Sequence, residues 1–297
     1  MLSVRILGGL RIFTATGAVD VHGEVQRRLL QSLIVSEGKI ISRELLVDEI
    51  WDGEPPAKAA NALQAHVSRL RRKLCSAEPG YRASRLVSHP RGYSLDLEDI
   101  EVDAIEFVHR VKSAETMKQS DPETAAAVLH AALPMWHGPV FGGDAGGQLS
   151  KAAATRYEEY RLRAFESLFD YELSRGRHSL ILGELQEIHV QNPFRERFCE
   201  QLMIALYRCG RQVDALEVYR RTWHLLIDEL GIEASPRLRS VEHAILSHDA
   251  VLIHDASGAP PKPDDTFSDL ISRVEISPVA RAPELRRGPP GRALTKR

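Results

Sequence analysis

The spacing of apolar residues divides the first hundred positions into short strands and three helices. Residues 4–23 are rich in Val and Ile and contain two Gly turns, which predicts a small β-meander. In the next segments apolar residues recur every three or four positions, and these predicted helices cover residues 25–36, 43–52 and 57–74. Ser42 is placed to cap the second helix. Residues 85–97 then predict a hairpin, so residues 1–97 are expected to form a winged helix-turn-helix.

The chain from residue 102 onward has helical periodicity and requires no strand. Gly176 and Gly210 are 34 positions apart, which is the period of tetratricopeptide repeats, and an earlier, weaker copy precedes them. Residues 102–250 are therefore predicted to form an all-α, tetratricopeptide-like domain, which makes the fold class mostly α with a small β component. Residues 257–297 are rich in Pro, Gly and Arg, which predicts a disordered tail with weak affinity for polyanions.

The third predicted helix separates its residues into two faces. One face is apolar and is expected to pack on the other helices. The opposite face and its flanks carry Asn61, Gln64, Ala65, Ser68, Arg69 and Arg72. Asn and Gln pair with adenine, Arg pairs with guanine or clasps phosphate, and Ala contacts the thymine methyl group. This set predicts a helix that reads the DNA major groove, and an ordinary solvated helix face is the alternative.

Arg91 lies at the tip of the predicted hairpin. It can enter a narrow minor groove, or it can remain in solvent as an ordinary turn residue. Tyr93 is expected to fix the hairpin to the core, and His66 to lie beside the packed face of the third helix rather than to read bases. Trp51 and Trp136 end apolar runs and are expected in the core.

The net charge of −2 conceals two regions of opposite sign. Residues 1–97 contain 14 Lys and Arg against 10 Asp and Glu, whereas residues 98–250 contain 17 against 25. A basic first region suits a polyanion, and the acidic second region suits a different partner. No stretch reaches the roughly 18 apolar residues of a membrane span. Three cysteines without a C-x-x-C pair are typical of a reducing compartment and are expected to be buried thiols.

The sequence offers no catalytic candidate. It contains no H-E-x-x-H or Cys-His metal spacing and no G-x-S-x-G nucleophile motif. The run from Gly142 to Leu149 has the two glycines of a phosphate-binding loop, but Gln148 and Leu149 replace the required Lys and Ser or Thr. We therefore expect a protein that is not an enzyme and that holds no metal and no cofactor.

Two stretches of sequence together resemble a known family. The stretch from Ser42 through LVDEIWDGEPPAKAANALQAHVSRLRRKL to RGYSL resembles the winged helix of OmpR-type regulators. The later stretches PFRERFCEQLMIALYRCGRQVDALEVYRR and LIDELGIEASPRLRSVEHAIL are similar to the bacterial transcriptional activation domain. Their union over residues 2–250 resembles the small form of the Streptomyces antibiotic regulatory protein family. The resemblance implies an activator of secondary-metabolite gene clusters that binds tandem direct repeats in double-stranded DNA and recruits RNA polymerase holoenzyme through its sigma factor.

The sequence therefore favours a cytoplasmic, nucleoid-associated transcriptional activator without a membrane partner. With no dimerisation seam in the winged helix, two copies are expected to bind direct repeats head to tail. A fragment truncated after Asp99 is expected to fold and to bind DNA with lower apparent affinity, but not to activate transcription. The alternative is a tetratricopeptide-type scaffold or ligand-sensing regulator, in which the helical domain is the working part and the winged helix contacts protein.

Overall fold

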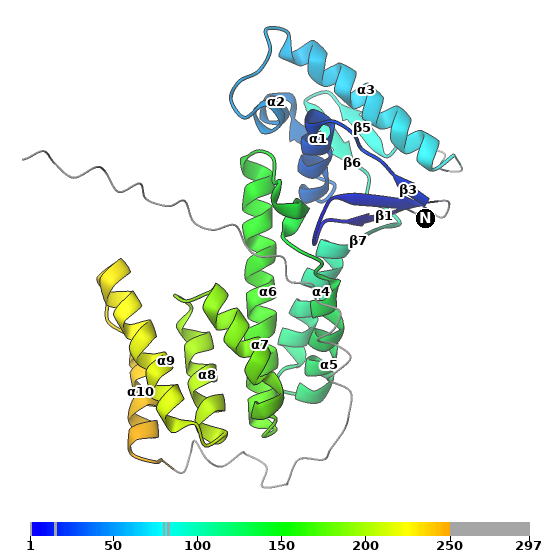
Figure 1. Ribbon diagram of the computed structural model, residues 1–297. Coiled ribbons are helices and arrows are strands. Elements are labelled where there is room, and N and C mark those ends of the chain that lie inside the picture. Colours follow the sequence, from blue (N-terminus) through cyan, green and yellow to red (C-terminus); the bar gives the residue numbers. More distant parts are fainter. Residues whose placement is uncertain (1, 15–16, 80, 82–83, 250–297) are drawn as a thin grey trace, which may run out of the picture.

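The computed structural model describes residues 2–14, 17–79, 81 and 84–249, so the tail expected at 257–297 lies outside the described residues. In Figure 1, α3 (Ala59–Ala77) crosses one end of the molecule, and the long α6 (Gln148–Ser174) runs from that end into a column of helices. The molecule is mostly helical with two small sheets, which confirms the predicted fold class. Among the described residues, no helix combines the length and the apolar character that crossing a bilayer needs.

The N-terminal meander forms the first sheet. Its strands are β1 (Leu2–Arg5), β2 (Arg11–Thr14), β3 (Gly17–Val19) and β7 (Ile100–Val102), in the order β3-β2-β1-β7. The first three pair antiparallel, as predicted, and Val4 and Ile12 turn into the core. β7 pairs parallel with β1 and places Val102 beside Val4. β7 was not predicted, because a three-residue strand has no period of its own and its partner lies at the other end of the winged helix.

The helix-turn-helix follows the meander. It comprises α1 (Glu24–Val35), α2 (Arg43–Trp51) and α3, together with the sheet β4-β6-β5 formed by β4 (Ile41–Ser42), β5 (Leu86–His89) and β6 (Gly92–Leu95). α2 begins after Ser42, whose hydroxyl accepts a hydrogen bond from the Leu45 N–H at 3.1 Å, as expected of its cap. The β5–β6 hairpin turns at Pro90 and Arg91, which confirms the predicted wing.

Helices fill the rest of the described chain. They are α4 (Asp103–Met117), α5 (Pro122–Ala132), α6, α7 (His178–Gln191), α8 (Glu196–Arg208), α9 (Gln212–Leu225) and α10 (Pro236–Leu246), with 3-10 turns η1 (Leu133–Met135) and η2 (Val140–Gly143) and the π turn η3 (Leu226–Leu230). Gly176 separates α6 from α7 and Gly210 separates α8 from α9, with φ of 73° and 75°. These left-handed turns, 34 positions apart, close the two predicted helical hairpins.

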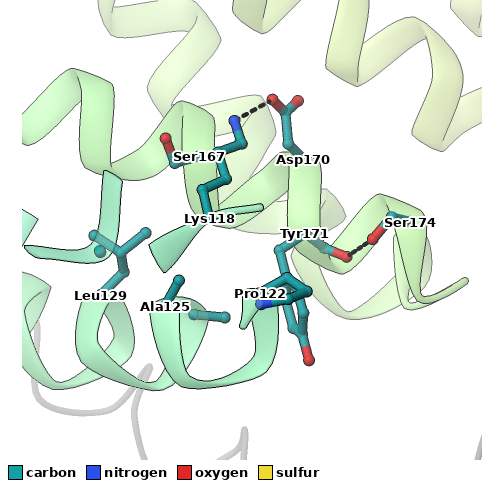
Figure 2. A pocket seen from close by; sticks show the side chains of 10 residues that line it. Lys118, Pro122, Ala125, Leu129, Ser167, Asp170, Tyr171 and Ser174 are labelled. Carbon is teal, nitrogen blue, oxygen red and sulfur yellow. Dashed lines mark hydrogen bonds and ion pairs between the residues drawn. The ribbon is translucent and has the colours of Figure 1, made fainter. Parts of the chain in front are cut away.

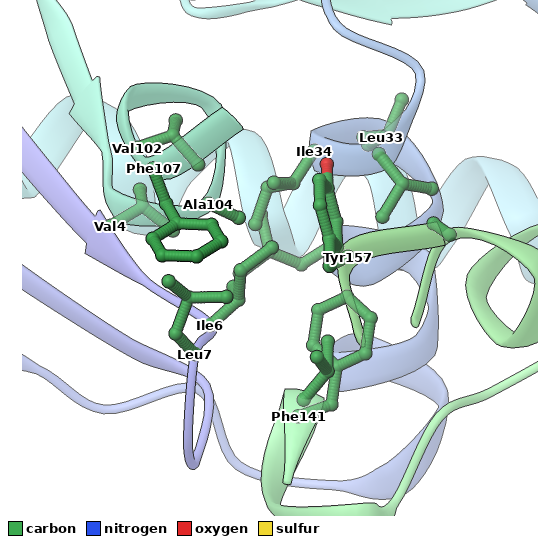
Figure 3. Packing of buried hydrophobic residues seen from close by; sticks show 14 of the residues in the cluster. Val4, Ile6, Leu7, Leu33, Ile34, Val102, Ala104, Phe107, Phe141 and Tyr157 are labelled. Carbon is green, nitrogen blue, oxygen red and sulfur yellow. The ribbon is translucent and has the colours of Figure 1, made fainter. Parts of the chain in front are cut away.

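Two clusters of buried apolar residues hold the molecule together. The first cluster runs from Leu2 to Leu168 and joins the winged helix to α4, α5 and most of α6. Figure 3 shows part of it, where β1, α1, α4 and α6 meet around Phe107 and Tyr157. The second cluster runs from Phe165 to Ile245 and joins α6 to α7 through α10. The core therefore continues across the expected domain boundary near residue 100, and the two clusters adjoin along α6.

The tryptophans and cysteines that were expected in the core differ in burial. Trp136 is buried, and Trp51 is half-buried against the first cluster. Cys199 is buried, but Cys75 is exposed and Cys209 is intermediate, so the expectation of three buried thiols was wrong. Cys75 directly follows Leu74, the last buried residue of α3, which turns Cys75 to solvent.

Candidate nucleic-acid interface

α3 packs one face on the core and leaves the other open. Its buried residues are Leu63, Val67, Leu70 and Leu74, which recur at helical spacing. Between residues 59 and 77 the helix carries four cationic side chains and no Asp or Glu. The exposed face of α3 therefore has a positive potential that is not offset by carboxylates of the same helix.

All six candidate reading residues of α3 are exposed. They are Asn61, Gln64, Ala65, Ser68, Arg69 and Arg72. The structure thus brings them together on the outer side of α3, away from the cluster that holds the helix. Their geometry suits contact with an external partner, while the choice of DNA bases stays a prediction.

Arg71 has a different role from its neighbours. Its Nε donates to the Leu86 carbonyl at 3.0 Å, and its Nη2 donates to the Ser88 hydroxyl at 2.7 Å. Both acceptors belong to β5, so Arg71 fastens α3 to the wing. This link fixes the angle between the two elements that are expected to enter adjacent grooves.

The wing tip presents Arg91 to solvent. The Arg91 carbonyl accepts a hydrogen bond from the Arg43 N–H at 3.3 Å, which fixes the tip to the start of α2. Gly92 lies so close to β4 that an added Cβ would be 1.8 Å from the Ile41 carbonyl oxygen, so only glycine fits. Tyr93 is 6% exposed and anchors the hairpin, as expected.

Arg43 is a candidate contact that the sequence analysis missed. It is the first residue of α2, is exposed, and holds its guanidinium 5.9 Å from the centre of the Tyr93 ring. The Arg43 side chain therefore lies beside Tyr93 of the wing, and its backbone N–H meets the Arg91 carbonyl. Nothing local in the sequence signals this, because β4 brings α2 to the wing only through its pairing with β6.

His66 lies on the flank of α3 and not on its open face. Its ring meets Trp51 edge to face, with centroids 6.2 Å apart, and its Nδ1 is 3.2 Å from the Gln26 amide nitrogen. Burial, and then the positive charge of Arg69, hold the pKa of His66 below its usual value. His66 thus packs beside the buried face of α3, as expected, and its exclusion from base reading stays a prediction.

A polar cluster stiffens the base of the wing. Arg85 forms an ion pair of 2.8 Å with Glu78 and stacks on the Tyr81 ring at 3.6 Å. The Tyr81 hydroxyl donates to Asp96 at 2.6 Å, and this hydrogen bond lowers the pKa of the Asp96 carboxyl. Because Arg85 is 4% exposed, the ion pair is shielded from solvent, and it links Glu78, which follows α3, to Arg85, which precedes β5.

The glycine-rich run from Gly142 onward leads into α6 and packs against the winged helix. The Gly146 N–H donates to the Gln31 side-chain oxygen of α1 at 3.0 Å, and the Leu149 N–H donates to the Glu49 carboxylate of α2 at 2.6 Å. Glu49 thus caps α6 from another helix, at the end where the helix dipole favours an anion. Two backbone N–H groups of this run are thus engaged by side chains of the winged helix.

Two surface ion pairs lie beside this junction. Arg27 of α1 pairs with Asp144 at 3.2 Å, and Arg156 of α6 pairs with Glu37 at 2.7 Å.

Across the part of the chain that the structure describes, no group of three His, Cys, Asp or Glu side chains is arranged to hold a metal ion. The exposed face of α3, with the wing beside it, is therefore the strongest candidate site.

Comparisons with known proteins agree with this architecture. A family model for the bacterial transcriptional activator domain matches residues 102–246, and one for the C-terminal domain of transcriptional regulatory proteins matches residues 23–95. The chain is 36% identical to the transcriptional regulator RedD of Streptomyces coelicolor over 252 residues, which cover 84% of this chain and 72% of RedD. It is 34% identical to the regulatory protein AfsR of the same species, of which it spans 25%.

A solved structure has the same arrangement. It is Mycobacterium tuberculosis EmbR in complex with a low affinity phosphopeptide, with a TM-score of 0.75 and 29% identity, covering 91% of this chain and 68% of that chain. The fold, the family models and the similarity to RedD together show that the chain belongs to the Streptomyces antibiotic regulatory protein family, whose members are transcriptional regulators and not enzymes.

Proposed function

We propose that this chain activates transcription of a secondary-metabolite gene cluster by binding direct repeats near its promoter and recruiting RNA polymerase holoenzyme through the sigma factor. The observation that carries the proposal is the open face of α3, where the six candidate readers are exposed on a helix without carboxylates. We place its action in the cytoplasm, on the nucleoid, because that is where its DNA lies.

The recognition step follows from the docking geometry of helix-turn-helix proteins. α3 lies in the major groove, and its N-terminal half contacts base edges. Asn61 and Gln64 suit adenine, Ala65 suits a thymine methyl group, and Ser68 suits either donor or acceptor edges. Arg69 and Arg72, in the C-terminal half, suit guanine or phosphate.

The wing supplies a second contact to the duplex. Arg91 enters the adjacent minor groove, where a narrow A·T tract attracts a guanidinium. Arg43 lies beside it and meets the phosphate backbone at the groove edge. Because the Arg43 N–H holds the Arg91 carbonyl, the two contacts move as one unit.

The helical part serves a partner other than DNA. Residues 98–250 contain 25 Asp and Glu against 17 Lys and Arg, and a polyanion is repelled by that balance. We assign DNA binding to residues 1–97 and the contact with polymerase to residues 102–250. Two protomers load head to tail on the direct repeats, which places both helical parts on one side of the DNA.

Substitutions on α3 test this proposal. Gln64→Ala is expected to cost about 1–3 kcal/mol on the specific site alone, because a base contact is lost. Arg72→Ala is expected to weaken binding to specific and random duplex alike and to lower the salt slope by about one. Arg221→Ala, an exposed arginine of α9, is the control that leaves DNA binding unchanged.

Duplex titrations over a range of salt concentrations measure these effects. Equal losses from Gln64→Ala on specific and random duplex would remove Gln64 from the set of base readers. No duplex binding by the full chain would instead favour the scaffold alternative, in which the winged helix contacts protein.

A further inference from the structure

A cavity of about 200 Å³ opens between α4, α5 and α6. Its apolar wall includes Ala114 of α4 and Ala125 and Leu129 of α5, all of which are buried. Tyr171 of α6 lines it as well. The cavity lies beside the stretch of α6 along which the two buried clusters adjoin.

The size and lining of the cavity suit an apolar group. An enclosed apolar cavity of roughly 150 Å³ accommodates a benzene ring, so about 200 Å³ leaves room for a ring and a small substituent. Water against the apolar wall of Ala114, Ala125 and Leu129 finds few hydrogen-bond partners, so an apolar group that displaces it there gains affinity. The aromatic face of Tyr171 adds a surface on which a ring can pack.

One charged pair marks the polar end of the cavity. The Lys118 ammonium lies 3.3 Å from the Asp170 carboxylate, and Figure 2 shows both beside Ser167, away from Ala125 and Leu129. The Lys118 side chain is 51% exposed and is therefore able to turn. The cavity thus has an apolar interior and a mobile cation at its rim.

The Asp170 carboxylate has hydrogen-bond and ion-pair partners other than Lys118. Its Oδ1 accepts a hydrogen bond from the Gln201 amide at 2.7 Å and also pairs with the Arg197 guanidinium, while Lys118 meets Oδ2. If Lys118 turns toward a ligand, Asp170 keeps two partners. If a cationic ligand entered instead, it would compete with both Lys118 and Arg197 for one carboxylate.

We propose that this cavity binds a small amphipathic carboxylate, with an aromatic ring between α4, α5 and α6 and its anionic group on Lys118. The Ser167 hydroxyl lies at the same end and can donate a second hydrogen bond to the carboxylate. This site is separate from the α3 face, so it can be tested without DNA and stands or falls independently of the proposed function.

The test compares three probes of similar shape on the full chain: phenylacetate, phenylacetamide and phenethylamine. Their dissociation constants are measured by calorimetry and by changes in amide NMR signals of α4 to α6. Phenylacetate is expected to bind at least about tenfold more tightly than the other two, because it alone places a negative charge against the Lys118 ammonium.

Two variants and a control locate the site. Lys118→Met is expected to abolish the preference for phenylacetate, and Ala125→Leu, which fills the cavity, to abolish binding of all three probes. Lys151→Met removes an exposed lysine elsewhere on α6 and is expected to change nothing. The thermal unfolding of Ala125→Leu is first compared with that of the unchanged protein. If Ala125→Leu does not fold, the test rests on Lys118→Met.

Three outcomes would overturn the proposal. They are no binding of phenylacetate, equal binding of phenylacetate and phenylacetamide, and a preference for phenylacetate that survives Lys118→Met. Tighter binding of phenethylamine would also overturn it, because Asp170 and not Lys118 would then select the ligand.

Discussion

Gly147 lies directly against the backbone of α2. A Cβ added to it would be 2.6 Å from the Glu49 Cα and 2.6 Å from the Glu49 side-chain carboxyl carbon. Turning a side chain cannot relieve a contact with a Cα atom, so the junction between α2 and α6 must open. Gly147→Ala is expected to lower the free energy of unfolding by about 1–3 kcal/mol, as measured by urea denaturation.

Gly183 provides the matched control for this substitution. It is an exposed residue inside α7, and an added Cβ there meets nothing within 4 Å. Gly183→Ala is expected to raise the free energy of unfolding by about 0.5–1 kcal/mol, because alanine loses less backbone entropy in a helix. Similar changes from both substitutions would contradict the close packing at Gly147.

His189 of α7 is expected to make the free energy of unfolding depend on pH, and the direction of its pKa shift gives the sign of this dependence. Burial holds the pKa of His189 below its usual value of 6.5, and its Nδ1 is buried without a hydrogen-bond partner among the described residues. Above pH 6.5 the ring is neutral in both the folded and the unfolded chain. As the pH falls below 6.5 the unfolded chain takes up the proton first, so stability decreases toward the lowered pKa.

His189→Leu removes that titration. The free energy of unfolding of the variant is therefore expected to fall less between pH 7 and pH 5 than that of the unchanged protein, which denaturation at several pH values measures. His22, whose side chain is 82% exposed, is the control site for the same substitution. An unchanged pH dependence in His189→Leu would show that the half-buried ring does not resist protonation.

For single residues, the sequence predicts those features that depend on contacts within one helix. Helical spacing alone separated Leu63 and Val67 from Asn61 and Gln64, because the two faces of α3 differ in polarity. The role of Gly147 was not predictable, since its neighbour Glu49 lies on a helix far earlier in the chain. The sequence excluded a phosphate-binding loop at Gly142–Leu149 but offered no role for its glycines, and close packing against α2 explains Gly147.

Among the elements, β7 and α4 decide whether the winged helix can stand alone. Asp103, the first residue of α4, accepts the N–H groups of Ile6 and Leu7 at 2.8 and 3.1 Å. Both of these residues are buried, and Figure 3 shows them beside Phe107 of α4. Removing α4 exposes their side chains, at about 1.5–3 kcal/mol each, and removes the acceptor of two buried N–H groups.

The structure therefore argues against the expectation that a fragment ending at Asp99 folds. That fragment lacks β7, α4 and Tyr157 of α6, and we expect no cooperative urea transition by circular dichroism. A fragment ending at Ser174 retains the whole first cluster and is expected to unfold cooperatively. A cooperative transition in the shorter fragment would contradict this account.

The elements differ in how far the sequence predicts them. Helices and the wing were recognisable because their period or turn residues are local, as at Ser42 and Gly210. The parallel strand β7 and the shared core were not, because both arise from contacts between residues at opposite ends of the winged helix.

For the whole molecule, the close packing and hydrogen bond between α2 and the start of α6 are expected to make the position of the helical part depend on how α3 lies on DNA. Inserting half a helical turn between two direct repeats would rotate the second protomer to the far side of the duplex. Activation is expected to collapse at this spacing and to recover in part at a full turn of about 10–10.5 bp. A promoter-spacing series read by transcription, with gel shifts for affinity, measures this.

Affinity for each single repeat is the internal control of that series, and it is expected to stay constant. Equal activation at half-turn and full-turn spacings would rule out the head-to-tail pair. It would favour independent monomers or a symmetric dimer formed before binding.

The capping of α6 by Glu49 also limits which parts of this protein can be exchanged with those of a relative. The residues that hold the helical part, Gln31 and Glu49, lie on α1 and α2, whereas the candidate readers lie on the far face of α3. Grafting those outward positions from a relative is expected to change the operator that is bound and to leave the hydrogen bonds from Gln31 and Glu49 intact. Grafting a complete foreign winged helix would also require a donor with a matching amide and carboxylate, so the exchangeable unit is one helix face and not one domain.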